Sequence, residues 1–135
     1  MTFIVDSSCI SRFILKESGW EKISDVLANS LTVDLALKEV ANSILKAYRR
    51  KEITLADLHT KFKALQMLIG KNILLEKQDD LIDDALQMTL ASNKLTIYDA
   101  LFIVLAKKKG MSLATCDHFQ YEEAVKNGMP ASIVE

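Results

Sequence analysis

The segment Phe3-Ile4-Val5-Asp6-Ser7-Ser8 opens the chain with an apolar run that ends at an acid and two hydroxyl residues. The apolar residues predict a short β-strand, and the hydroxyl side chains can cap the helix that follows. The same order returns near the other end of the chain, where the strand-like segment 111–115 is followed by Asp117 and another helical stretch. The repetition indicates a fold built from strands that each lead, through an acid, into a helix.

Between these two segments, short apolar runs keep alternating with amphipathic stretches. Within the longest amphipathic stretch, Val40, Ile44 and Tyr48 recur at helical spacing, and Asp34 is placed to cap its start. The sequence predicts strands at about 2–5, 31–33, 73–75 and 111–115, an edge strand at 132–134, and helices at about 7–16, 21–28, 35–51, 54–68, 79–91, 96–109 and 119–127.

This alternation predicts an α/β fold, because parallel strands need crossover connections and the connecting helices must pack against the sheet. We expect a three-layer sandwich, with a central parallel sheet of four or five strands and helices on both faces. A single proline, Pro130, and four glycines leave no candidate linker. Residues 1–135 are therefore expected to form one domain.

The charge balance excludes a general attraction to polyanions. Lys and Arg total 17 against 18 Asp and Glu, for a net charge of -1. Any nucleic acid must therefore be held by local groups, such as Lys46 and residues 49–51 on one helix or residues 107–109 on another. The alternative is that these cations complement the helix dipoles and stay solvated.

Cysteine usage and hydropathy indicate the cellular compartment of the protein. Cys9 and Cys116 form no CxxC pair, so we expect buried free thiols rather than a zinc site or a disulfide framework. Residues 1–5 have no basic lead-in and Asp6 interrupts the apolar run, which predicts no signal peptide. The longest apolar run, 100–106, is far shorter than the roughly 20 residues of a membrane span. A cytoplasmic location without membrane attachment is expected.

Four acids are candidates for chemistry, and each has a simpler explanation when taken singly. Asp6 and Asp117 follow predicted strands, but an aspartate before a helix is also a favoured N-cap worth about 1 kcal/mol. Asp99 lies three residues after Thr96, in a capping-box-like arrangement. Glu39 lies opposite the apolar stripe of its helix, as a solvated glutamate would. Capping and solvation therefore remain open for the individual residues.

The four acids together suggest more than capping. Strands that run parallel bring their carboxyl ends to one edge of the sheet, which is where ligands bind in such folds. Clustered carboxylates repel one another, and this raises their pKa values unless cations compensate. Hard divalent ions such as Mg²⁺ prefer oxygen ligands. The combination favours a magnesium site used for phosphate chemistry.

Four segments of this sequence, in this order, resemble the PIN-domain family. They are Phe3-Ile4-Val5-Asp6-Ser7-Ser8, Glu39-Val40-Ala41-Asn42, Thr96-Ile97-Tyr98-Asp99-Ala100-Leu101-Phe102 and Leu113-Ala114-Thr115-Cys116-Asp117. Together they extend the resemblance over nearly the whole chain. The short, single-domain length is most similar to the VapC toxins of toxin-antitoxin pairs.

The resemblance implies a PIN-like sheet whose acids meet in one pocket and hold one or two Mg²⁺ or Mn²⁺ ions. By the same resemblance, Asp6, Asp99 and Asp117 are the main metal ligands, and Glu39 helps to bind a second ion or to position water. The implied reaction is hydrolysis of RNA phosphodiester bonds by metal-ion catalysis. The implied catalytic residues are Asp6, Glu39, Asp99 and Asp117, with Ser7, Ser8, Asn42 and Thr115 in support.

The resemblance also implies partners other than RNA. VapC-like proteins pair with a small VapB-type antitoxin, and a homodimer is expected. The apolar side chains of the early helices could form such a face, with core packing as the alternative. The residues in question are Ile10, Phe13, Ile14 and Trp20.

Two alternatives belong to other classes of protein. One is a catalytically idle PIN-like module that binds RNA or protein. The other is a magnesium-dependent phosphoryl-transfer domain, which is disfavoured because Asp6 is followed by Ser7 and Ser8 rather than by the second acid that receivers and dehalogenases need. His59 and His118 are expected at the surface, and neither is assigned a role.

Overall fold

The structure, a computed structural model, describes residues 2–135. Residue 1 lies outside the described part of the chain. It belongs to the segment 1–5, for which the sequence predicts no signal peptide. The strands form one sheet in the order β3-β2-β1-β4-β5, and every neighbouring pair is parallel. The strands are β1 (Ile4–Val5), β2 (Ser30–Val33), β3 (Ile73–Glu76), β4 (Leu113–Thr115) and β5 (Ala131–Ile133).

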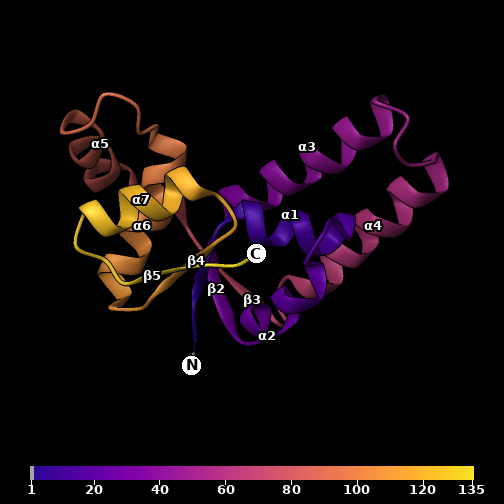
Figure 1. Cartoon of the computed structure of the whole chain (residues 1–135), viewed down its shortest axis with the longest axis horizontal. Coiled ribbons are helices and arrows are strands. Elements are labelled where there is room, and N and C mark those ends of the chain that lie inside the picture. Colours follow the sequence, from indigo (N-terminus) through magenta and orange to yellow (C-terminus); the bar gives the residue numbers. More distant parts are fainter. Residues whose placement is uncertain (1) are drawn as a thin grey trace.

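Helices cover both faces of this sheet. Figure 1 shows α1, α3 and α4 on one side of the strands, with α3 and α4 forming a long hairpin, and α5, α6 and α7 on the other. The three-layer α/β sandwich and the edge strand β5 are therefore as predicted. The helices are α1 (Ser7–Leu15), α2 (Ser24–Leu27), α3 (Leu35–Arg49), α4 (Leu55–Leu68), α5 (Ile82–Leu90), α6 (Ile97–Lys109) and α7 (His118–Lys126), with the 3₁₀ turns η1 (Trp20–Ile23) and η2 (Gln78–Asp80).

The two strands that precede the candidate acids are neighbours at the centre of the sheet. Val5 pairs with Ala114, and the amide of Asp6 continues the ladder by donating to the Ala114 carbonyl at 3.4 Å. β1 and β4 are buried along their whole length, which explains why both read as continuous apolar runs. This pairing brings residues 6 and 117 to the same edge of the sheet.

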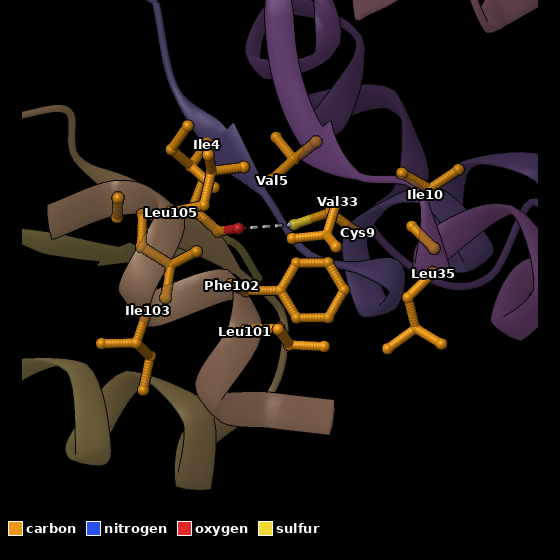
Figure 2. Close-up of a cluster of buried hydrophobic side chains, with 14 of the residues drawn as sticks. Ile4, Val5, Cys9, Ile10, Val33, Leu35, Leu101, Phe102, Ile103 and Leu105 are labelled. Carbon is orange, nitrogen blue, oxygen red and sulfur yellow. Dashed lines mark hydrogen bonds between the residues drawn. The ribbon is translucent and has the colours of Figure 1, made fainter. Parts of the chain in front are cut away.

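The core lies between this centre and α6. Residues 100–106 of α6 are all buried, so this helix is apolar around its whole circumference. Figure 2 shows Phe102 of α6 beside Val33 of β2 and Cys9 of α1. Ile10 and Ile14 are buried in the same core. Core packing, rather than a docking face, is therefore the role of these two residues.

Phe13 and Trp20 are half-buried and pack edge-to-face, with their ring centroids 5.8 Å apart. Lys16 covers the Trp20 ring at 5.6 Å from its centroid. These contacts fix the turn after α1, so the two aromatic side chains also serve local packing.

Two predicted helices differ in the structure. The stretch 21–28 is not one helix, because Gly19, with φ of +84°, starts the separate 3₁₀ turn η1 before the short α2. The predicted helix 79–91 begins with the turn η2, and α5 starts only at Ile82.

The predicted cap at Asp34 is also wrong. Asp34 makes no side-chain cap to α3, and its carboxylate accepts from the amide of Gln78 at 3.1 Å instead. The carboxylate therefore joins the end of β2 to the segment after β3.

The cationic ends of α3 and α6 lie at the surface. Lys107, Lys108 and Lys109 occupy the last turn of α6, where they complement the helix dipole, and Lys109 pairs with Glu76 at 3.1 Å. Arg49 and Lys51 are exposed at the far end of α3. Among residues 2–135, no helix is both long and apolar enough to span a membrane.

Candidate active site

Asp6 is the most buried of the four candidate acids, with 4% of its surface exposed. One carboxylate oxygen accepts from the Ser8 hydroxyl and from the Cys9 amide, the latter at 3.3 Å. The bond from Cys9 is the N-cap of α1, so the capping explanation is correct for this residue. The other oxygen accepts from the hydroxyl of Thr115. Asp6 therefore has more partners than a cap requires.

Thr115 joins two of the candidate acids. Its side chain is fully buried at the end of β4, and its hydroxyl donates to Asp6. The same hydroxyl oxygen accepts from the Asp117 amide at 3.0 Å. Thr115 thus fixes the backbone of Asp117 relative to the carboxylate of Asp6, although these residues are far apart in the sequence.

Asp117 and Asp99 lie at the starts of α7 and α6. Asp117 is exposed and caps α7 by accepting from the Phe119 amide at 2.9 Å. At α6 the Thr96 hydroxyl is the cap, accepting from the Asp99 amide at 3.2 Å. The capping-box explanation is therefore wrong for the Asp99 carboxylate, which is half-buried in the first turn.

Glu39 is not the solvated glutamate that its helical position allowed. It is half-buried on α3, and its carboxylate accepts from the Ser7 hydroxyl at 2.9 Å. Because Ser7 directly follows Asp6, this bond ties α3 to the start of α1. Asn42, one turn later on α3, is exposed and borders the same surface pocket as Glu39.

In these four acids, which we call the acidic centre, burial and neighbouring acidic charge raise the pKa values of Asp6, Asp99 and Glu39. Burial raises the pKa of Asp6 from 3.8 to about 6, although its hydroxyl and amide donors favour the charged form. Burial and the charge of Asp117 raise the pKa of Asp99, and burial and the charge of Asp99 raise that of Glu39. Asp117 also adds to the rise at Asp6. The charge of Asp117 thus acts on Asp6 and Asp99, and the charge of Asp99 acts on Glu39.

The donor set suits a hard divalent cation. Within residues 2–135, none of the four carboxylates has a Lys, Arg or His partner within 4.0 Å, so their charge has no internal counter-ion. Carboxylate and hydroxyl oxygens are the ligands that Mg²⁺ and Mn²⁺ prefer. In this described part of the chain, however, no three His, Cys, Asp or Glu side chains converge on one point closely enough to hold an ion. The four acids lie near one another, but their carboxylates do not surround a single point in the described residues.

A polar pocket of about 390 Å³ adjoins the acidic centre between α1 and α3. Ser7 and Glu39 form part of its wall, and Arg12 and Lys46 bring positive charge to it. By contrast, Arg49 and Lys51 border a different pocket at the turn between α3 and α4. Lys46 therefore borders a different pocket from Arg49 and Lys51, although the three residues are close in sequence.

Sequence reasoning missed three features of this region. Arg12 lies between Ser11 and the apolar run 13–15, and nothing in its spacing pointed to the pocket. Gln120 is buried on α7 and donates to the Asp99 carbonyl at 2.9 Å, which joins the helices that carry Asp99 and Asp117. Cys9 is a buried free thiol, as predicted, whereas Cys116 is free but only half-buried, and the two sulfur atoms lie 3.4 Å apart. The parallel pairing of β1 and β4 was the only available signal for this proximity.

The two histidines are exposed, as expected. His118 pairs with Glu135 at 3.0 Å, and His59 lies on the outer face of α4. Neither joins the acidic centre.

Comparison with known proteins gives a consistent result. The PIN domain family profile matches residues 3–124. Ribonuclease VapC3 of Pyrobaculum aerophilum is 30% identical over 127 residues, which cover 87% of this chain and 90% of that protein.

Two crystal structures have the same fold. PAE2754 from Pyrobaculum aerophilum has a TM-score of 0.66 and 21% identity, over 91% of this chain and 87% of its own. VapC20 of Mycobacterium tuberculosis, a toxin that cleaves the sarcin-ricin loop, has a TM-score of 0.66 and 15% identity, over 94% of this chain and 95% of its own.

Proposed function

Because this chain belongs to the PIN-domain family, we propose that it is an endoribonuclease that depends on a divalent metal ion and acts as the toxin of a toxin-antitoxin pair. The relative with 30% identity is a ribonuclease of the VapC type, and the match extends over most of both chains. The observation that supports the proposal most strongly is the acidic centre itself, in which burial and neighbouring acidic charge raise the pKa values of Asp6, Glu39 and Asp99, and no Lys, Arg or His side chain of residues 2–135 pairs with any of the four carboxylates.

We assign Asp6, Asp99 and Asp117 to metal binding. Burial and the charge of Asp117 raise the pKa values of Asp6 and Asp99, and a bound cation would offset this cost of charging the carboxylates. Glu39 would bind a second ion or hold water, oriented by the bond from Ser7. Magnesium or manganese, in one or two ions, fits the oxygen donors.

Supporting residues fix the geometry of these ligands. Thr115 donates to Asp6 and accepts from the Asp117 amide, so it holds two ligands at once. Ser8 donates to Asp6 and approaches Thr115 at 3.2 Å between the hydroxyl oxygens. Bound metal supplies a nucleophile of lowered pKa and stabilises charge on the phosphate. The chain contributes position and a partly desolvated setting.

The pocket beside the acidic centre is our candidate for holding the RNA next to the bond that is cut. Arg12 and Lys46 provide cations for a neighbouring phosphate, and Asn42 provides donors and acceptors for a base or ribose. This arrangement would offset the repulsion between four acids and the polyanion. Loss of Lys46 should therefore weaken RNA binding more than loss of Arg49, which lies outside this pocket.

We also propose a VapB-type antitoxin as partner, on the strength of the VapC relative, and a cytoplasmic location, where RNA and such an antitoxin meet. A homodimer is proposed from an exposed apolar stripe on α5, formed by Ile82, Leu86 and Leu90 at intervals of four residues. Leu86→Glu should shift the protein to monomer in sedimentation. An unchanged sedimentation coefficient would remove the stripe as the interface.

The proposed activity is tested by incubating the purified chain with structured RNA and Mn²⁺, with and without a chelator, beside Asp6→Asn. We expect cleavage that the chelator abolishes and that Asp6→Asn lacks. Equal cleavage by the variant would refute the assigned site. Failure to cut any RNA tried would favour a PIN-like module that binds without cutting.

A further inference from the structure

Cys9 and Cys116 are separated by 107 positions in the chain, yet their sulfur atoms lie 3.4 Å apart. The contact arises from the parallel pairing of β1 with β4, since each cysteine follows the end of one of these strands. Both are free thiols in the structure. The sulfur atoms are thus about 1.4 Å farther apart than in a disulfide bond, whose length is about 2.05 Å.

The two thiols differ in access to solvent. Cys9 is fully buried in the first turn of α1, and Figure 2 shows its side chain among the core residues, with the sulfur directed at a main-chain oxygen. That oxygen is the Ala114 carbonyl, 3.6 Å from the sulfur. Cys116 is half-buried and borders two surface pockets, one beside the acidic centre and one next to His118. A small molecule can therefore reach Cys116 but not Cys9.

Both cysteines contact groups that position the acidic centre. The Cys9 amide donates to the Asp6 carboxylate at 3.3 Å. The Cys116 amide donates to the Ser8 hydroxyl at 2.9 Å, and Ser8 in turn donates to Asp6. Cys116 also directly precedes Asp117. A change in the distance between the two sulfur atoms therefore acts on the backbone that holds Asp6 and Asp117.

We infer that Cys9 and Cys116 form a redox modification site, at which a small-molecule disulfide oxidises the pair to an intramolecular disulfide and thereby lowers the activity of the acidic centre. The effect on activity rests on the proposed function, whereas the formation of the bond does not.

The chemistry proceeds by two thiol-disulfide exchanges. The Cys116 sulfur, as thiolate, attacks one sulfur of the oxidant, which forms a mixed disulfide and releases the first small thiol. The Cys9 sulfur, after losing its proton, attacks the Cys116 sulfur and displaces the second small thiol. Overall, two protein thiols lose two hydrogens, and one oxidant molecule becomes two thiols.

We expect closing the gap between the sulfur atoms to draw the first turn of α1 toward the segment that joins β4 to α7. A displacement of about 1 Å at a catalytic group can lower a rate on the order of 100-fold. We expect oxidation to lower RNA cleavage by at least about tenfold, and a thiol reductant to restore it.

The test treats the full chain with oxidised glutathione, quenches free thiols, and combines peptide mass mapping with RNA cleavage. We expect a peptide that links Cys9 to Cys116, together with the loss of cleavage described above. The variant Cys116→Ser keeps a small polar side chain at this half-buried position. Its cleavage rate should be the same with and without oxidant, whereas that of the wild-type chain should fall when oxidant is added.

Three outcomes would overturn the inference. One is a pair that stays reduced in the folded chain under conditions that oxidise it in urea. Another is glutathione that persists on Cys116 without exchange to Cys9. The third is a disulfide that forms while cleavage stays unchanged. If the reduced protein cuts no RNA, the proposed function fails separately, and Mn²⁺ affinity of the two forms replaces cleavage as the readout.

Discussion

Two groups of four acids in this molecule behave differently. One is the acidic centre, whose members are spread from position 6 to position 117 and come from four separate segments of the chain. The other lies within six positions on η2 and α5 and consists of Asp79, Asp80, Asp83 and Asp84, all of which are exposed. The group on η2 and α5 is the denser in sequence, but all its members are exposed, whereas Asp6 of the acidic centre is buried and Glu39 and Asp99 are half-buried. Convergence and burial, rather than local density of charge, make a candidate metal site.

Replacing one acid from each group should separate them most strongly. Asp99→Asn should lower RNA cleavage by more than about 100-fold, since we propose Asp99 as a direct ligand and loss of a ligand exceeds the 10–100-fold effect typical of outer-shell groups. Asp83→Asn should cleave at the wild-type rate, because its side chain is exposed on α5. Initial rates with Mn²⁺ would measure both. Similar cleavage rates for the two variants would contradict the functional difference between the two groups of acids.

Burial of Asp6 should make the metal-free protein sensitive to pH. Its pKa is about 6 in the folded chain against 3.8 for the exposed group. The folded protein therefore holds the Asp6 proton more tightly than the unfolded chain does. The stability that this protonation provides is fully present below pH 3.8 and is lost as the pH rises through 6. At neutral pH, Asp6→Asn without metal should be more stable than wild type by up to about 3 kcal/mol.

Urea unfolding at acid and neutral pH, in the presence of a chelator, would measure this difference. The advantage of Asp6→Asn should appear only at the higher pH. A variant that is equally stable at both would contradict the assigned cost of the buried charge. Asp83→Asn, from the exposed group, should follow the wild-type profile.

Thr115→Val should weaken the link between two members of the acidic centre. The change removes the donor to Asp6 and the acceptor for the Asp117 amide, with little change in shape. We expect cleavage to fall about 10–100-fold and stability to fall by about 1–3 kcal/mol. Thr115→Ser, which keeps the hydroxyl, should recover most of the rate. If both variants cleave equally well, the hydroxyl does not position the acids.

Ser7→Ala should have the smallest effect of the series. It removes one hydrogen bond to a half-buried carboxylate, that of Glu39. A single bond of this kind contributes about 0.5–1.5 kcal/mol, so we expect a decrease of about twofold to tenfold in the cleavage rate. Ser24→Ala, which removes an exposed serine hydrogen bond on α2 outside this pocket, is the control and should leave the rate unchanged. A drop as large as that of Asp99→Asn would mean that Ser7 is itself a ligand.

The sequence was sufficient for the sheet and for most of the helices, because apolar strands followed by capped helices leave few alternatives. It was insufficient at Gly19 and Asp34, where a positive φ and a contact with Gln78 decide the local structure. Both depend on tertiary contacts or on backbone conformation that apolar periodicity does not encode.

For the site, sequence reasoning identified the acids but not their surroundings. Each acid alone was compatible with capping or solvation, and two of them do cap helices. What distinguishes Glu39 is its bond to Ser7, and what distinguishes Asp6 is its second oxygen on Thr115. Such contacts join segments that are distant in sequence, so no local pattern predicts them.

Metal binding tests the central claim most directly. Titration of Mn²⁺ should give saturable binding to the wild-type chain, and Asp99→Asn and Asp117→Asn should bind at least about tenfold more weakly. Asp34→Asn is the matched control, since Asp34 follows β2 at the same edge of the sheet but is engaged with Gln78, and it should bind like wild type. Equal affinity in all four proteins, or no binding by any of them, would contradict an acidic centre that holds metal.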